Sequence, residues 1–343
     1  MLDINDFSKK QILVYSPMKG DKLSYRNDNM IISNSDGEIK YQTTCYRIFM
    51  VLVIGDCTIT TGLLRRAKKF GFSICFSSYQ LRLYATVNAA MEGNILLHEK
   101  QFSYEGNGIA KLLVYNKIIN QCALLGKIRN KSPYVKEGID MLRKYSDDIL
   151  KLQEPELGEI LGVEGNASRI YFARVFDILD WKGRKPRIKF DYINSLLDIG
   201  YSILFNFVDC ILQVFGFDVY QGVLHTRFYM RKSLVCDLME PFRPIIDWRV
   251  RKGIGLKQFK KDDFIVVGNQ WQLEYKYSSK YAGIFLEDLL ANREAIFLYL
   301  RSYYRSFMKG KAVSFFPVFD ITAEHIKMIE DDGALVNYDY REL

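Results

Sequence analysis

Residues 191–215 read DYINSLLDIGYSILFNFVDCILQVF, and no other stretch says as much about the fold. Its apolar side chains return every three or four positions, which is the spacing of one buried helical face. A connecting loop follows at 217–224, with Gly216 just before it. We therefore predict a long core helix here. The residues that share this spacing are Ile193, Leu196, Leu197, Tyr201, Leu204, Val208, Ile211 and Phe215.

The flanking segments predict further helices. Apolar residues in 102–125, 135–152 and 158–179 follow the helical period, and another helix begins near Ser233. A last amphipathic helix is predicted over 284–307, with its aromatic side chains in the core. The chain from residue 97 onward is therefore expected to be mostly helical, apart from the loop at 217–224 and a loosely held acidic tail after Pro317.

The first 96 residues predict a different structure. Short apolar runs alternate there with turn residues, as in β-strands. A single short helix is expected over 63–69, ended by Gly71. The fold class is therefore α+β, with a small β-rich domain at 1–96 and a larger all-α catalytic domain at 97–343. The predicted extended runs are 12–15, 30–32, 48–53, 72–76 and 81–86.

Composition and charge narrow the class of protein. The chain has 343 residues, 49% of them hydrophobic, which suffices for a core. Its net charge of +8 favours a polyanionic partner, and residues 225–261 hold ten Lys or Arg against three acids. The six cysteines form no C-x-x-C pair, which predicts reduced thiols and a cytoplasmic location. The longest uncharged run is too short for a membrane span, and the N-terminus has no signal-peptide core.

Four side chains are candidates for chemistry. Glu164 falls on the apolar stripe of its helix, where an ionised carboxylate needs a partner or a metal. His225 ends an apolar loop, unlike His98 and His325, which we expect at the surface. Asp237 and Glu240 are three residues apart, which places them on one helix face.

Each of these signals has an ordinary alternative. Glu164 can be a helix-start carboxylate favoured by the helix dipole. His225 can be structural, and the acidic pair can be an exposed turn balanced by nearby Arg and Lys. Together, however, two carboxylates, an imidazole and a third nearby acid suit Mg²⁺ or Mn²⁺. Basic surroundings add what phosphodiester chemistry requires.

Three stretches resemble the CRISPR-associated endonuclease and integrase family Cas1. They are EGNASRIYF at 164–172, DYINSLLDIGY at 191–201, and GVLH at 222–225 followed by SLVCDLMEPFRP at 233–244. The resemblance implies a metal triad of Glu164, His225 and Glu240, with Asp237 as an assisting catalytic acid. It also implies a homodimer joined through the β domains and a Cas2 partner that bridges two dimers.

The implied reaction is transesterification. The 3′-hydroxyl of a captured DNA, the spacer precursor, attacks a phosphodiester at the edge of a CRISPR repeat. Two alternatives remain open, a structure-selective nuclease of DNA repair and a non-catalytic DNA-binding adaptor. In each case basic side chains are expected to hold DNA phosphates. The candidates are Arg169, Arg174, Arg227, Arg231, Lys232, Arg249, Arg251 and Lys252.

Overall fold

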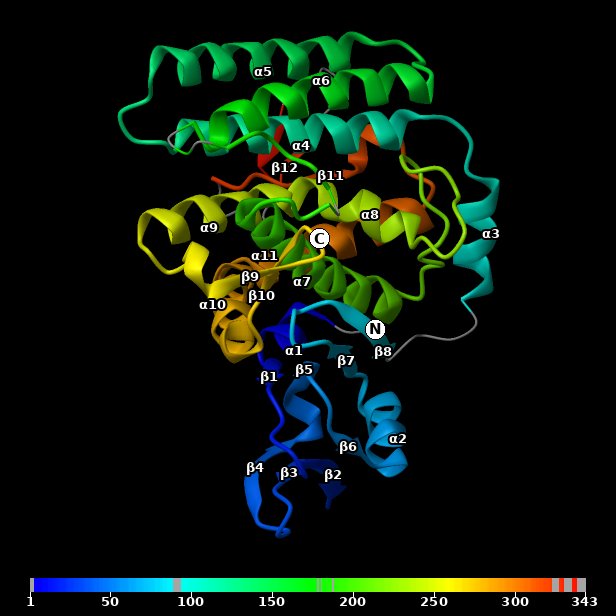
Figure 1. Cartoon of the computed structure of the whole chain (residues 1–343). Helices are drawn as coiled ribbons and strands as arrows, with labels where there is room; N and C mark the ends of the chain where they lie inside the picture. Colours follow the sequence, from blue (N-terminus) through cyan, green and yellow to red (C-terminus); the bar gives the residue numbers. More distant parts are fainter. Residues whose placement is uncertain are drawn as a thin grey trace.

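A computed structural model of the chain describes residues 3–88, 94–177, 179, 181–186, 188–322, 327–329 and 335–337. Figure 1 shows a smaller part built of strands below a larger helical part, with the N-terminal residues in blue at the bottom. The predicted fold class, a β-rich N-terminal region followed by a mostly helical region, is confirmed.

Two four-stranded sheets form the smaller part. The first has the order β1-β5-β7-β8, in which β1, β5 and β7 are parallel and β8 is antiparallel. The second has the order β4-β3-β2-β6. The elements are α1 (Ile4–Ser8), β1 (Gln11–Tyr15), β2 (Lys22–Arg26), β3 (Asn29–Ser33), β4 (Ile39–Thr44), β5 (Ile48–Ile54), β6 (Thr58–Ile59), α2 (Thr61–Phe70), β7 (Ser73–Ser77) and β8 (Leu83–Val87).

Strand β5 joins the two parts of the molecule because both of its faces are buried. Val51 and Val53 belong to the core of the smaller part, whereas Leu52 and Ile54 belong to the main core of the helical part. This follows from the pleat of a strand, which sends successive side chains to opposite faces. An uninterrupted apolar run is what such a strand requires.

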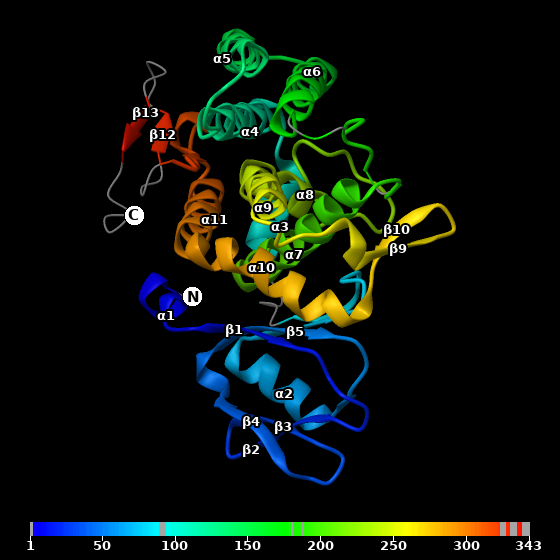
Figure 2. The ribbon, with the colours of Figure 1, turned by 60° about the vertical axis from the view of Figure 1, so that its left-hand side comes forward.

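The helical part is arranged around one central helix. Helices α4, α5 and α6 lie together on one side of it, and Figure 2 shows this group at the far end from the sheets. The helices are α3 (Ile95–Ser103), α4 (Gly108–Gly126), α5 (Pro133–Lys151), α6 (Leu157–Val175), α7 (Tyr192–Phe215), α8 (Ser233–Met239), α9 (Arg243–Gly255), α10 (Ser278–Ala291) and α11 (Arg293–Met308). Short strands complete the part: β9 (Phe264–Val267), β10 (Gln270–Leu273), β11 (Pro317–Val318), β12 (Lys327–Ile329) and β13 (Leu335–Asn337).

The central helix is α7, as the sequence predicts. Asp191 caps its first turn by accepting a hydrogen bond from the Asn194 N–H at 2.7 Å, and Gly216 ends it in the left-handed conformation at φ 83°. It packs against α8, α9, α10 and α11. By length and composition α7 could cross a membrane, but 83% of its most apolar window is buried inside the protein.

Three expectations about the helical part need correction. The single helix predicted over 284–307 is wrong, because α10 and α11 are separated at Asn292, whose side chain donates to the Asp288 carbonyl at 2.8 Å. The stretch at 264–273 is an unpredicted β-hairpin. The change of period near residue 102 falls at the end of a separate helix, α3, and α4 begins only at Gly108.

The domain boundary that we placed between residues 96 and 97 falls inside α3, whereas the last strand of the sheets ends at Val87. All six cysteines lie in the described part of the chain, and all are free thiols.

Candidate active site

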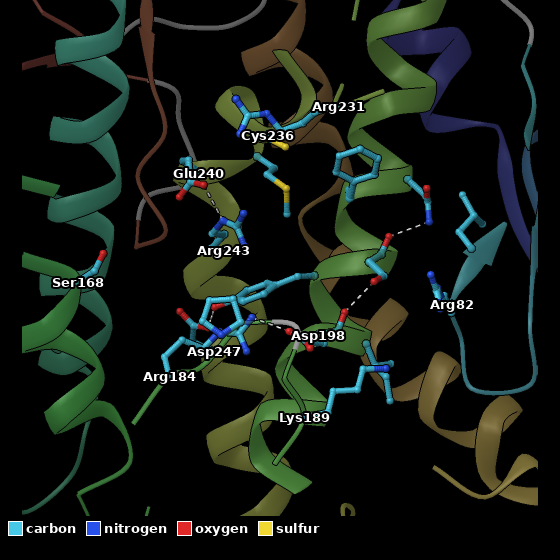
Figure 3. A pocket seen from close by; sticks show the side chains of 18 of the residues that line it. Arg82, Ser168, Arg184, Lys189, Asp198, Arg231, Cys236, Glu240, Arg243 and Asp247 are labelled. Carbon is cyan, nitrogen blue, oxygen red and sulfur yellow. Dashed lines mark hydrogen bonds and ion pairs between the residues drawn. The ribbon is translucent and has the colours of Figure 1, made fainter. Parts of the chain in front are cut away.

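A large cleft opens between α6, α7, strand β8 and the segments at 181–189 and 228–243. Its volume is about 1930 Å³, and Figure 3 looks into it. Among the described residues, nine Lys and Arg side chains line it against four acids, so we call it the basic cleft. The basic residues are Arg82, Lys117, Arg169, Lys182, Arg184, Lys189, Arg231, Lys232 and Arg243, and the acids are Glu164, Asp198, Glu240 and Asp247.

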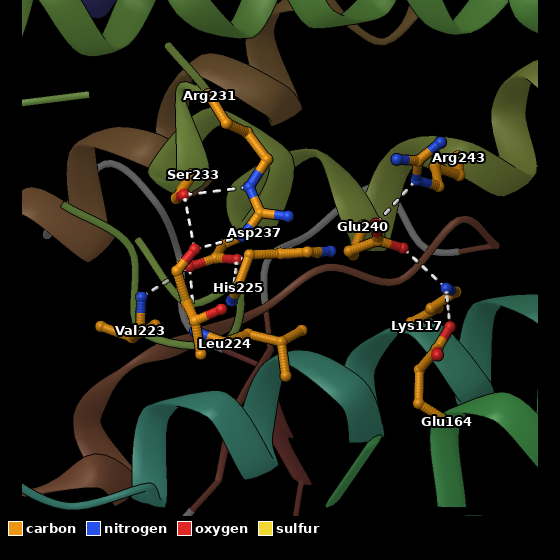
Figure 4. A network of polar contacts seen from close by, with 11 residues as sticks. Lys117, Glu164, Val223, Leu224, His225, Arg231, Ser233, Asp237, Glu240 and Arg243 are labelled. Carbon is orange, nitrogen blue, oxygen red and sulfur yellow. Dashed lines mark hydrogen bonds and ion pairs between the residues drawn. The ribbon is translucent and has the colours of Figure 1, made fainter. Parts of the chain in front are cut away.

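Two of the predicted carboxylates converge on one cation at the wall of this cleft. Glu164 comes from α6, and Glu240 opens the 3₁₀ turn Glu240–Phe242 that follows α8. The ammonium group of Lys117, from α4, contacts Glu164 Oε1 and lies 2.7 Å from Glu240 Oε2 (Figure 4). Three helices distant in sequence therefore meet at one positive charge.

The surroundings of Glu240 hold it ionised. Burial alone would raise the pKa of this carboxyl, but the charges of Arg243 and Lys117 outweigh burial and lower it to about 2. Arg243 Nε donates to Glu240 Oε1 at 2.8 Å, and its guanidinium lies over the ring of Tyr201. Glu164 is less enclosed, and its Oε1 also accepts from the Ser168 hydroxyl at 2.9 Å. Glu240 thus remains anionic at neutral pH because two cations lie against it.

His225 and Asp237 form a second cluster beside the first. Asp237 is completely buried, and its Oδ1 lies 2.6 Å from His225 Nδ1. The same carboxylate accepts hydrogen bonds from the backbone N–H groups of Val223, Leu224 and His225 at 2.6, 3.0 and 2.9 Å. Asp237 therefore shapes the loop before His225 and fixes the orientation of its imidazole.

Gly222 makes this loop possible. A Cβ at position 222 would lie 2.6 Å from Asp237 Oδ2 and 3.0 Å from the His225 carbonyl oxygen. The close approach of the loop to the carboxylate excludes every larger residue. The expectation that Asp237 and Glu240 lie on one helix face needs a refinement, since Asp237 faces His225 whereas Glu240 faces Lys117 and Arg243.

The residues present fit a divalent metal, although among the described residues no three His, Cys, Asp or Glu side chains stand close enough together to hold one. Glu240 Oε2 is buried, and within the described chain it makes no hydrogen bond of good geometry, only its ion pair with Lys117. Two carboxylate oxygens directed at one cation are the ligands that Mg²⁺ and Mn²⁺ prefer. With Nδ1 of His225 directed at Asp237, Nε2 is the nitrogen left to bind a metal.

A sequence model of the family described as "CRISPR associated protein Cas1" matches residues 14–287, which is most of the chain. The chain belongs to the Cas1 family. Among curated proteins, it is 29% identical to a CRISPR-associated endonuclease Cas1 of Thermodesulfovibrio yellowstonii over 62% of this chain and 72% of that one. It is also 29% identical to one from Moorella thermoacetica, over 67% of this chain and 72% of that one.

Solved structures share the fold. A Cas1 protein from Thermotoga maritima matches with a TM-score of 0.73 at 18% identity, over 88% of this chain and 98% of that one. A casposase bound to its integration product matches with a TM-score of 0.71 at 21% identity, over 91% and 95%. A chain of a Cas6-RT-Cas1–Cas2 complex matches with a TM-score of 0.75 at 21% identity, over 92% of this chain and 36% of that one.

The eight predicted phosphate-binding residues of this Cas1 chain lie in different places. Arg169, Arg231 and Lys232 line the basic cleft, and Lys232 also pairs with Asp209 at 2.6 Å. Arg227 lies beside a smaller hollow, next to the ring of Phe102. The remaining four, Arg174, Arg249, Arg251 and Lys252, are not among the residues that line the cleft.

Three of those four are engaged within the protein. Arg174 is buried against Gly138 and donates to the carbonyls of Tyr134 and Ile170 at 3.0 and 3.1 Å. Arg249 is buried and holds both carboxylate oxygens of Asp288 at 2.5 Å. Arg251 donates to the Val175 carbonyl and pairs with Asp177 at 3.2 Å. These contacts are a reason to remove the three from the DNA-binding candidates.

Sequence reasoning missed Lys117 and Asp247. Lys117 is the one charged residue among the buried side chains of α4, and the sequence carries a signal for it, because a buried lysine requires an acidic or hydrogen-bonding partner. Asp247 accepts hydrogen bonds from Tyr201 and, at 2.8 Å, from Tyr171. Burial raises its pKa to about 6, although both tyrosine hydroxyls oppose this. Both tyrosines are buried in the core.

Proposed function

We propose that this Cas1 chain is a metal-dependent DNA integrase and endonuclease of CRISPR adaptation. It joins the 3′-hydroxyl ends of captured DNA to phosphodiesters at the CRISPR repeat by transesterification. One observation carries the proposal: Glu164 and Glu240 converge on a single cation at the wall of a basic cleft. The family match supports it, since curated relatives are named CRISPR-associated endonucleases.

The proposed divalent metal, Mg²⁺ or Mn²⁺, would be held by Glu164, Glu240 and His225. When bound, such an ion polarises a phosphoryl oxygen and stabilises the attacking or leaving oxygen. Asp237 is a positioning residue in this scheme, because it orients His225 and offers no oxygen to the cleft. Arg243 keeps Glu240 ionised.

The lining of the cleft supplies the contacts to DNA. Arg169, Lys182 and Arg231 come from three different segments and face one hollow, so that they can neutralise successive phosphates of a strand. In the joining step the 3′-oxygen of the captured end forms one phosphorus–oxygen bond while another breaks. The number of such bonds is conserved, and the step consumes no nucleotide cofactor.

We propose two kinds of protein partner. The family resemblance implies a homodimer joined through the β-rich parts and a Cas2 protein that bridges two dimers. One solved neighbour is a chain of a Cas6-RT-Cas1–Cas2 complex, which supports this partnership. The casposase neighbour is bound to an integration product, which supports strand joining as the reaction.

The deciding experiment is integration of a short DNA duplex into a supercoiled plasmid that bears a CRISPR array, with Mn²⁺ or with EDTA. We expect joining only with the metal, and its loss in the His225→Ala variant while DNA binding survives. His98→Ala is the matched control, because His98 contacts the Gly216 carbonyl away from the carboxylates. Full activity of His225→Ala would remove the proposed triad.

The same assay separates the alternatives. Binding of DNA without any metal-dependent turnover would indicate a non-catalytic adaptor. A preference for cutting flaps or junctions over joining at repeats would indicate a repair nuclease.

A further inference from the structure

Lys117 is an unusual residue to find at this place in the fold. Its side chain is buried, yet it carries a charge and contacts carboxylates from two other elements, Glu164 on α6 and Glu240 after α8. Arg243 completes the cluster through Glu240. Two cations and two anions are therefore enclosed together, and their formal charges cancel.

This neutral cluster resists a divalent metal as it stands. A metal bound between the carboxylates would need their oxygens at about 2.0–2.6 Å. Lys117 Nζ already lies 2.7 Å from Glu240 Oε2 and contacts Glu164 Oε1, and an ammonium group has no lone pair to offer a metal. The ammonium and the metal would occupy the same space and repel each other.

We propose that Lys117 is the counter-ion of the metal-free site, and that it exchanges the two carboxylates for a DNA phosphate when the metal binds. Metal binding and DNA binding are then coupled through this one side chain. The inference rests on the proposed metal-dependent function.

The position and chemistry of Lys117 support the exchange. Its side chain lines the basic cleft, so a strand in the cleft brings phosphates toward it. A lysine stem has four rotatable carbons, and its ammonium binds as a point charge, so it changes partners without the fixed geometry that a guanidinium demands. The neighbouring cations of the cleft, Arg169 and Arg231, would hold the strand beside it.

Coupling of this kind is reciprocal. If DNA takes Lys117 from the carboxylates and so strengthens metal binding, the metal must strengthen DNA binding by the same factor. Coupling of this type typically amounts to about 5- to 150-fold. Without the lysine charge, the carboxylates should be open to the metal whether or not DNA is bound. The part of the coupling between metal binding and DNA binding that passes through Lys117 should then be lost.

The test measures Mn²⁺ affinity by electron paramagnetic resonance, with and without a duplex whose 3′ ends are dideoxy and cannot react. We expect Lys117→Met to bind Mn²⁺ at least tenfold more tightly than the wild type without DNA, and to gain less from adding DNA. Lys111→Met is the matched control, since Lys111 lies on the same helix but donates to the carbonyls of Leu150 and Leu152. It should behave as the wild type.

Thermal unfolding gives a second readout that does not depend on DNA. Without Lys117, the neighbouring carboxylates of Glu164 and the buried Glu240 repel each other, so Lys117→Met should melt below the wild type in EDTA and should gain more from Mn²⁺. If the methionine variant does not fold, Lys117→Gln, which keeps N–H donors without the charge, takes its place with the same expected results.

The outcomes separate the two levels of the proposal. If the wild type binds Mn²⁺ and the Lys117 variants bind it equally well or more weakly, the counter-ion role of Lys117 alone is overturned. If the wild type binds no Mn²⁺ with or without DNA, the metal-dependent function itself fails.

Discussion

The substitution Asp237→Asn tests how His225 is positioned. The carboxylate accepts four hydrogen bonds, two on each oxygen: Oδ2 from the N–H groups of Val223 and Leu224, and Oδ1 from the backbone and imidazole nitrogens of His225. An asparagine keeps one acceptor oxygen and turns an NH₂ group toward the other two donors. Bonds to a charged group contribute about 1.5–3 kcal/mol each, so loss of two should cost about 3–6 kcal/mol.

Two measurements check this expectation. Urea unfolding should show the loss of stability, which is a large share of the roughly 5–15 kcal/mol available to a folded domain. Strand joining with Mn²⁺ should fall because the imidazole is no longer held, even at temperatures where the variant is folded. Asp140→Asn is a suitable control, since Asp140 is exposed on α5. An Asp237→Asn protein within about 1 kcal/mol of the wild type and fully active would refute the positioning role.

The other predictions concern charge. Arg174→Ala should destabilise the protein by about 2–4 kcal/mol, because it empties a buried site and removes two hydrogen bonds to carbonyls, but should leave the salt dependence of DNA binding unchanged. Arg169→Ala should change the free energy of unfolding by less than about 0.5 kcal/mol, yet should reduce by about one the slope of log affinity against log salt. Burial raises the pKa of Asp247 from 3.8 to about 6. Its protonated form therefore contributes stability that is fully present below pH 3.8 and is lost as the pH rises through 6. The free energy of unfolding of Asp247→Asn, measured in urea, should therefore rise by up to about 3 kcal/mol relative to that of the wild type between pH 4 and pH 7.5. A difference between the two proteins that does not change with pH would contradict this expectation.

The sequence allowed much of the fold to be predicted because local signals and burial agreed. The apolar period of α7, the end of α2 at Gly71 and the short apolar runs between turn residues in the N-terminal part each come from a local sequence pattern. The break between α10 and α11 escaped because Asn292 interrupts a continuous apolar period without any Gly or Pro. In the missed hairpin, Gly268 and Asn269 both adopt positive φ, at 54° and 65°, which is a turn signal that we did not use.

The candidate site was harder to predict in detail. Family resemblance directed attention to Glu164, His225 and Glu240, but spacing alone could not say that Asp237 and Glu240 face different neighbours. Arg174, and Arg249 in the basic stretch at 225–261, were both candidate phosphate ligands, and only tertiary packing shows that backbone carbonyls engage the first and Asp288 the second. The partners of Lys117, Glu164 and Glu240, are distant in sequence, and they meet it only because of how the helices pack. The spacing of residues along the chain does not contain that information.

The helix that carries Lys117 has a further tie with consequences for biogenesis. Asn116 and Asn120, on either side of it, exchange hydrogen bonds with the backbone at Phe319, and Asn120 also reaches the Pro241 carbonyl. The helix that carries Lys117 is thus held in place by a segment that is synthesised long after the helix itself. We expect α4 to gain its full set of hydrogen bonds only after residue 319 has been synthesised, so that the cluster around Lys117 forms late in the folding of the chain.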